Sequence, residues 1–117
     1  MSKVLIVEDD QQMARLLQTL LELEGHEALA TPRPDVIVDM VRETRPDVVV
    51  MDLHLGHVET VDVLETLKAD PALKTIPVIV VSGLDAEEQC AQAGADAFML
   101  KPYSPSALLA KIKELVK

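Results

Sequence analysis

Apolar runs of strand length alternate along this chain with segments that have the periodicity of helices. This alternation is typical of repeated βα units, which fold into an open parallel sheet with helices on both faces. Sheets of this kind bind ligands at the edge formed by the carboxyl ends of their strands. The residues that follow each run are therefore the first candidates for a site. The four strongest runs are Val4–Val7, Val48–Met51, Val78–Val81 and Ala97–Leu100.

Each of these runs stops at polar or turn-forming residues. Acidic residues follow the first two runs, a hydroxyl and a glycine follow the third, and an amine follows the fourth. Because the carboxyl ends of parallel strands share one edge, we expect these groups to converge. In chain order they are Glu8, Asp9 and Asp10, then Asp52, then Ser82 and Gly83, and finally Lys101 and Pro102.

The size and charge of the chain limit the classes of function. Its 117 residues, 49% of them hydrophobic, suffice for one core, so we expect a single domain over residues 1–117. The 20 Asp and Glu residues outnumber the 11 Lys and Arg residues, and the formal net charge of −9 repels a phosphate backbone. We therefore expect no direct binding of nucleic acid.

The sequence also predicts a soluble, cytoplasmic protein. The first apolar run is too short for a signal peptide, and no stretch of roughly 20 apolar residues is present to span a bilayer. Cys90 is the only cysteine, so an internal disulfide is impossible, and we interpret this residue as a small apolar filler on a helix.

Helix signals lie between the apolar runs. The first helix is expected to bury an apolar stripe and to end near Gly25. A weak strand is expected over Glu27–Ala30, followed by two prolines and a helix over Val36–Val41. The stripe of the first helix consists of Met13, Leu16, Leu17, Leu20 and Leu21.

Three more helices are expected in the second half of the chain. One should run near Thr60–Ala69 and end before a proline. The Asp85–Glu88 segment has the capping-box pattern, and Gly94 is placed to end the short helix that it begins. Ser104 and Pro105 have the order of a cap and a first-turn proline, which predicts a last helix after them.

In this order the motifs resemble the receiver domain of two-component response regulators, over the whole of Lys3–Lys117. The Val4–Asp10 segment is similar to the family's first strand with its acidic pair, and Val48–Leu55 to the strand and turn that hold the phosphate-accepting aspartate. The Val78–Gly83 and Ala93–Tyr103 segments resemble the strands that end in a hydroxyl residue and in Lys-Pro. The resemblance implies a doubly wound, flavodoxin-like α/β fold with five parallel strands in the order 2-1-3-4-5.

The resemblance implies a phosphorylation-dependent switch that catalyses only its own phosphoryl transfer and dephosphorylation. Asp52 is then the acceptor of a phosphoryl group from a histidine kinase or histidine phosphotransfer protein. Lys101 pairs with Asp52 at rest and with a phosphoryl oxygen afterwards, and the Ser82 hydroxyl and Gly83 amide hold another oxygen. Ser82 and Phe98 are the implied switch residues.

The same resemblance implies Mg²⁺ as the cofactor. Asp9 and Asp52 are the implied side-chain ligands, the backbone carbonyl of His54 is a third, and Glu8 acts directly or through water. Asp10 fits the role of a helix cap better than that of a ligand. The expected output is contact with a downstream protein, including a possible phosphorylation-dependent dimer, because no output domain is expected in residues 1–117.

Two alternatives remain open. A small haloacid-dehalogenase-like phosphatase also uses an aspartyl nucleophile and Mg²⁺, but it places the nucleophile on its first strand, whereas Asp52 follows the third. A constitutive protein-binding pseudo-receiver is the second alternative, and the intact set of acids, hydroxyl and amine argues against it. His54 and His57 also have a spacing compatible with a transition-metal site, but without a nearby third imidazole or thiol we interpret them as solvated loop residues.

The chain departs from the family pattern in three places. Gly56 stands where a proline is usual, and Thr60 stands where a glycine is usual, so we expect a different, looser turn after Asp52. The interval from Ser82 to Lys101 is shorter than usual by about one helical turn, or three to four residues. A shortened fourth helix is therefore expected, and the family's usual partner face cannot simply be carried over.

Overall fold

A five-stranded parallel sheet forms the centre of the molecule in the computed structural model, which describes residues 2–116. Its strand order, β2-β1-β3-β6-β7, is the predicted 2-1-3-4-5 order once the strands of this sheet are counted along the chain. The predicted doubly wound, flavodoxin-like α/β fold is confirmed. The strands are β1 (Lys3–Val7), β2 (Glu27–Thr31), β3 (Val48–Asp52), β6 (Val78–Ser82) and β7 (Ala97–Leu100).

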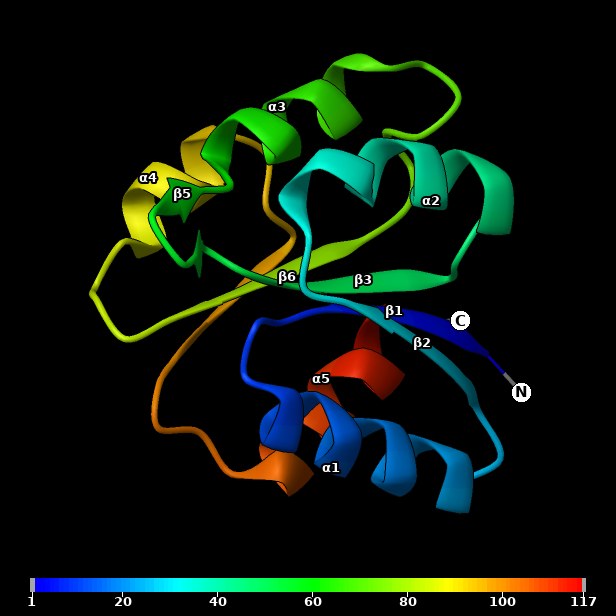
Figure 1. The fold of residues 1–117 in the computed structure, drawn as a ribbon. Coiled ribbons are helices and arrows are strands. Elements are labelled where there is room, and N and C mark those ends of the chain that lie inside the picture. The colour runs from blue at the N-terminus through cyan, green and yellow to red at the C-terminus, as the bar shows by residue number, and fades with distance from the viewer. Residues whose placement is uncertain (1, 117) are drawn as a thin grey trace.

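Helices cover both faces of this sheet (Figure 1). Two of them lie on one face, namely α1 (Gln11–Leu23) and α5 (Pro105–Leu115). The other face carries α2 (Ile37–Thr44), α3 (Val61–Ala69) and α4 (Glu87–Gln92), with the short 3-10 turn η1 (Pro34–Val36) leading into α2.

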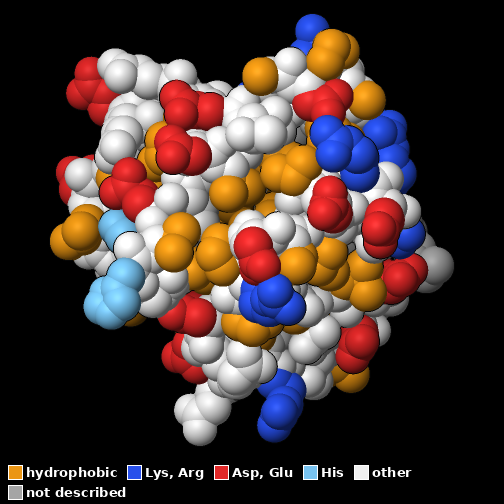
Figure 2. Space-filling view, turned by 45° about the horizontal axis from the view of Figure 1, so that its top comes forward, with side chains coloured by type: hydrophobic (Ala, Val, Ile, Leu, Met, Phe, Trp, Pro, Cys, Tyr) orange, Lys and Arg blue, Asp and Glu red, His pale blue; other side chains and the backbone are white. Residues whose placement is uncertain are grey.

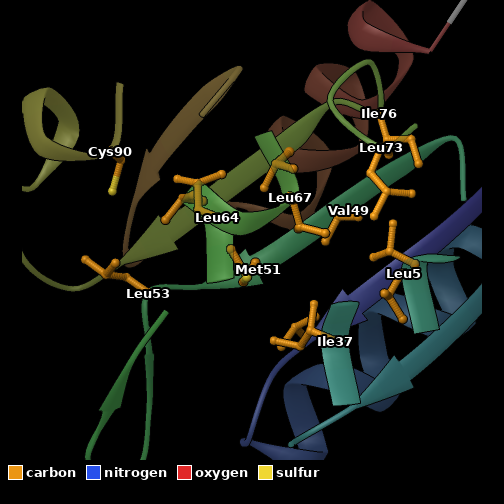
Figure 3. Packing of buried hydrophobic residues seen from close by; sticks show 14 of the residues in the cluster. Leu5, Ile37, Val49, Met51, Leu53, Leu64, Leu67, Leu73, Ile76 and Cys90 are labelled. Atoms are coloured by element: carbon orange, nitrogen blue, oxygen red, sulfur yellow. The ribbon is translucent and has the colours of Figure 1, made fainter. Parts of the chain in front are cut away.

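Both faces of the sheet are buried, which explains why its strands are continuous apolar runs rather than alternating ones. Along β1, Leu5 and Val7 pack toward α2 and α3, whereas Val4 and Ile6 pack toward α1 and α5. Figure 3 shows the first of these two clusters, with Leu53 and Cys90 at one end. Leu73 and Ile76 lie at the opposite end (Figure 3). The sheet therefore separates two cores and is held rigidly between them.

The segment between β3 and α3 forms a two-stranded antiparallel hairpin. It consists of β4 (His54–Leu55) and β5 (Val58–Glu59), joined by a turn in which Gly56 has a φ of 61°. This conformation excludes proline, whose ring fixes φ near −65°. The expected difference in conformation is therefore confirmed. The turn is not looser, however, because the segment pairs as a hairpin that the sequence did not predict.

The helix ends largely agree with the sequence. The Asp10 carboxylate accepts hydrogen bonds from the amides of Gln12 and Met13, which confirms it as the cap of α1. Ser104 caps α5 in the same way. Leu16 differs from the prediction, because 43% of its surface is exposed and the stripe that α1 buries is narrower than its leucines indicate.

The fourth helix is short, as expected, but it begins in a different manner. Its N-cap is Ala86, and no side chain caps it, so the predicted capping box at Asp85–Glu88 is wrong. Asp85 lies one position too early to accept from the first turn. Cys90 is the single buried residue of α4, and burial together with the charge of Glu59 raises the pKa of its thiol. Its predicted role as a small apolar filler is confirmed.

Gly94 ends α4 with a φ of 106°, a conformation that side chains rarely adopt. A Cβ atom here would stand 2.7 Å from Cγ of Lys68, whose ammonium donates hydrogen bonds to the Ile76 carbonyl and the Asp96 carboxylate. We expect Gly94→Ala to lower the free energy of unfolding by more than the roughly 1–2 kcal/mol of the backbone strain alone. Urea denaturation measures this loss.

Gly25 provides the matched control for that variant. Its φ is 88°, and nothing lies within 4 Å of an added Cβ, so Gly25→Ala introduces the strain without the collision. The loss should be larger for Gly94→Ala. Equal losses in the two variants would show that Lys68 moves aside without cost.

No helix within residues 2–116 is both long and apolar enough to cross a membrane.

Candidate phosphoacceptor and metal site

Asp52 is the last residue of β3 and therefore lies at the edge formed by the carboxyl ends of the strands. Only 5% of its surface is exposed. One carboxylate oxygen, Oδ2, accepts a hydrogen bond of 2.5 Å from the Lys101 ammonium, and the other, Oδ1, accepts one of 3.1 Å from the His54 amide. The predicted pairing of Asp52 and Lys101 is therefore present, and each oxygen of the carboxylate is fixed by a separate element.

Lys101 follows β7 directly, and its amide donates to the Ser82 carbonyl at 2.7 Å, continuing the pairing between β6 and β7. Its ammonium reaches across the sheet edge to Asp52 and stands 3.5 Å from Oε1 of Glu8. Burial by itself would lower the pKa of Lys101, but the hydrogen bond and charge of Asp52, helped by Glu8, raise it above its ordinary value. The amine therefore remains a cation between two carboxylates.

Glu8 is the most deeply buried acid of the group, with 3% of its surface exposed. Its Oε2 accepts a hydrogen bond of 3.1 Å from the Asp10 amide, which turns the carboxylate back toward the sheet edge. Burial raises the pKa of Glu8, although the Asp10 amide and the Lys101 charge oppose the shift. The nearby Asp52 charge adds to it. A bound cation would relieve this cost because it would stabilise the ionised carboxylate.

Asp9 is exposed, and its Oδ2 accepts a hydrogen bond of 2.9 Å from the Gly56 amide in the hairpin turn. Carboxylate oxygens of Asp9, Glu8 and Asp52 all lie within 4.8 Å of one another. Three carboxylates so close together repel each other and offer the hard oxygen ligands that Mg²⁺ prefers. The donor set therefore fits a hard divalent cation. Of the groups expected to converge, Glu8, Asp9, Asp52 and Lys101 lie together, whereas the Asp10 carboxylate caps α1 instead.

Ser82 and Gly83 occupy the end of β6 and the turn after it. The Ser82 hydroxyl is fully buried and accepts a hydrogen bond of 3.0 Å from the Leu84 amide. Gly83 is exposed, with open space where a Cβ would stand. Phe98 lies on β7, half-buried against the core under α2, α3 and α4. These residues lie on the expected strands, and movement of the Ser82 and Phe98 side chains stays a prediction.

Two residues near the site were not recognised from the sequence as parts of it. Thr60 is fully buried, and its hydroxyl lies 2.9 Å from the Asp52 carbonyl oxygen. Tyr103 lines a cavity of about 330 Å³ together with Glu8, Lys101 and three neighbours, and its hydroxyl has no hydrogen-bond partner among the described residues. Burial, and then the charge of Glu8, raises the pKa of Tyr103. Tyr103 follows Lys-Pro at the strand end, a signal that could have placed it here.

The sequence profile of the response regulator receiver domain matches residues 4–113, which is nearly the whole chain. The chain belongs to the response regulator receiver family. Among curated relatives of this receiver, the polar-differentiation response regulator DivK of Brucella anthropi is 36% identical over 113 residues, covering 94% of this chain and 92% of its own. DivK of Brucella ovis is 35% identical with the same coverage.

Solved structures agree with the fold of the receiver. The receiver domain of the Francisella response regulator 1452 has a TM-score of 0.90 at 24% identity, covering 99% of this chain and 97% of that one, and it supports the fold alone. The receiver domain of a signal transduction histidine kinase from Syntrophus aciditrophicus has a TM-score of 0.89 at 29% identity, covering 99% and 90%.

Family membership places this receiver in phosphorylation-dependent two-component signalling, with histidine kinases or phosphotransfer proteins as the class of partner. Receiver domains are signalling proteins and generally not enzymes. None of these comparisons supports the phosphatase or the pseudo-receiver alternative. The topology agrees, since Asp52 ends the third strand of the sheet in chain order rather than the first.

Proposed function

We propose that Asp52 accepts a phosphoryl group from the phosphohistidine of a kinase or phosphotransfer protein, and that this changes a protein-binding surface. The observation that carries the proposal is the buried Asp52 carboxylate, held 2.5 Å from the Lys101 ammonium and within a cluster of three acids. In the transfer, a carboxylate oxygen of Asp52 forms the new O–P bond while the N–P bond of the donor breaks. The imidazole keeps the electron pair of that bond and takes up a proton.

The surrounding residues contribute position and charge, which is most of what this reaction requires. Lys101 is placed to neutralise charge on a phosphoryl oxygen, because its ammonium already lies on Asp52. The Ser82 hydroxyl and the Gly83 amide are proposed to hold a second oxygen. For this, the hydroxyl must act as a donor toward the phosphoryl group, whereas it now accepts from the Leu84 amide. Asp52 itself exposes little surface, which limits competing attack by water.

Mg²⁺ is the proposed cofactor. Glu8, Asp9 and Asp52 would hold it with the backbone carbonyl of His54, because their carboxylate oxygens already converge. When bound, the ion supplies positive charge that offsets the negative charge on the phosphoryl oxygens. Glu8 is the acid whose burial most favours such a counter-charge, since its pKa is raised by desolvation.

Residues 1–117 are proposed to form one receiver domain whose output is contact with a protein. The net charge of −9 argues against nucleic acid as the direct target. In Figure 2 acidic side chains are spread over the face shown, including the edge where the histidines stand, and lysine and arginine gather mainly at the other edge. We place this activity in the cytoplasm, in keeping with a buried, unpaired Cys90.

Binding of beryllofluoride, a mimic of the acyl phosphate, is expected to change amide exchange most in two segments, Gly83–Gly94 and Phe98–Tyr103. These segments are attached to Ser82 and Lys101, the residues expected to move toward the phosphoryl oxygens. The short α4 lies within the first of these segments and opposes rearrangement only weakly. Exchange measured by mass spectrometry with and without beryllofluoride tests this, and Asp52→Asn serves as the control that should not respond. A response confined to α2 would contradict the proposal.

A further inference from the structure

Thr60, the residue just before α3, is hydrogen-bonded to the end of β3. Its side chain is fully buried, and its hydroxyl lies 2.9 Å from the Asp52 carbonyl oxygen and 3.2 Å from that of Leu53. The Thr60 amide donates a further hydrogen bond of 2.7 Å to the Leu53 carbonyl. Thr60 thus contacts the carbonyl oxygens of both Asp52 and Leu53, where the chain leaves β3.

This use of the hydroxyl is unusual for its position in the helix. Thr60 is the N-cap of α3, where a threonine oxygen ordinarily accepts a hydrogen bond from an amide of the first turn. Here the side chain makes no such bond. The hydroxyl is directed toward the Asp52 peptide, and the start of α3 lacks a side-chain cap as a result.

The Asp52–Leu53 peptide lies at the last hydrogen bond of the sheet: the Leu53 amide still donates to the Val81 carbonyl at 2.8 Å, and the Asp52 carbonyl on its other side accepts from Thr60. Pairing between β1 and β3 stops at Val7 and Met51, and pairing between β3 and β6 stops at Asp52 and Val81. The Thr60 hydroxyl is therefore the donor that continues this support on the Asp52 carbonyl. Its removal leaves a buried acceptor without that partner, which favours displacement of the peptide.

The hairpin is tied to the candidate site at a second point. The Gly56 amide donates to the Asp9 carboxylate at 2.9 Å, so the hairpin turn contacts one proposed metal ligand while the hairpin base contacts another through Thr60. Between these two points lies His54, whose amide donates to Asp52 Oδ1. The hairpin therefore supports the acidic cluster from outside, as the hydrogen-bonding partners of metal ligands do elsewhere.

We propose that Thr60 is a positioning residue for the phosphoacceptor: its hydroxyl fixes the peptide that carries Asp52 and, through the base of the hairpin, the orientation of His54. This proposal rests on the proposed function and extends it to a residue that touches neither donor nor metal. A role confined to folding would change stability alone. Positioning must also change the site while the protein is fully folded.

The test compares Thr60→Val and Thr60→Ala, which remove the hydroxyl, with Thr60→Ser, which keeps it. In the metal-free protein we expect His54 amide exchange to be at least about tenfold faster in Thr60→Val and Thr60→Ala than in wild type. We expect Mg²⁺ affinity, measured by calorimetry, and phosphorylation by acetyl phosphate at saturating Mg²⁺ each to fall about 10- to 100-fold. Thr60→Ser should restore all three values to near those of wild type.

Two further variants serve as controls. Thr66→Val removes a hydroxyl-to-carbonyl hydrogen bond of the same kind within α3, and Ile76→Val lowers stability at the end of the core away from Leu53 (Figure 3). Both should leave His54 exchange and Mg²⁺ affinity unchanged. Wild-type values in folded Thr60→Val and Thr60→Ala would overturn the proposal, as would an equal effect of Ile76→Val.

The exchange measurement separates this proposal from the proposed function. Should wild type itself fail to bind Mg²⁺ or accept phosphate, the proposed function would be wrong. The His54 amide in the metal-free protein would still show whether Thr60 holds the Asp52 peptide: faster exchange in the hydroxyl-free variants supports positioning, and unchanged exchange refutes it.

Discussion

Asp52→Asn is expected to abolish phosphorylation by acetyl phosphate or a histidine kinase. An amide in place of the carboxylate has the same shape but lacks the charged nucleophilic oxygen that forms the O–P bond. The Asp52 position is the point where Lys101, His54 and the acidic cluster meet, so no other carboxylate is equivalently placed to take over. Intact-protein mass spectrometry after incubation with donor and Mg²⁺ should show no phosphorylated species.

Asp62→Asn is the matched control for this experiment. Asp62 is an exposed aspartate in the first turn of α3, close in sequence but outside the acidic cluster. Its replacement should leave phosphorylation at the wild-type level. Undiminished labelling of Asp52→Asn would show that another residue is the acceptor, and peptide mapping of the labelled protein would locate it.

Asp9→Ala and Asp10→Ala are expected to have opposite effects although the two residues are adjacent. Asp9 contributes an oxygen to the three-carboxylate cluster, so its loss should weaken Mg²⁺ binding at least about tenfold and slow phosphorylation. In the metal-free protein, relief of the repulsion among the three carboxylates offsets the loss of the hydrogen bond from the Gly56 amide, and the variant is expected to be as stable as wild type or more so. Calorimetry with Mg²⁺ and thermal denaturation measure the two quantities.

Asp10→Ala should instead lower the free energy of unfolding by about 1 kcal/mol and leave Mg²⁺ affinity near the wild-type value. The Asp10 carboxylate accepts from two amides of the first turn of α1, and both bonds are lost in the variant. The loss appears as a lower midpoint of thermal denaturation. Equal weakening of Mg²⁺ binding by both variants would show that the ligands are wrongly assigned.

Much of the site could be predicted because its parts lie at the ends of apolar strands. A parallel sheet aligns those ends regardless of the helices between them, so Asp52 and Lys101 had to converge once the strands were recognised. The Asp10 cap was predictable because it depends only on a local hydrogen bond between its side chain and the first amides of α1. The short α4 followed from the length of chain available between two fixed strands.

The remaining features depend on contacts that a local pattern does not encode. The β4–β5 hairpin has two residues per strand, too few for an alternation to be recognised. Thr60 has the sequence appearance of an ordinary helix cap, and only the folded chain shows its hydroxyl directed toward Asp52. Leu16 has the right spacing for the core, but the face of α1 that the sheet covers is narrower than the stripe of leucines.

Because α4 is short, little free energy is needed to change the surface that it forms. Six residues do not sustain a helix in water, and burial of the small Cys90 side chain contributes on the order of 1 kcal/mol. A partner that prefers the unwound segment therefore needs only about tenfold higher affinity for it to rival the folded form. Recognition at this surface can then select between the helical and the unwound segment with modest contact energy, so even a weakly binding protein can distinguish them.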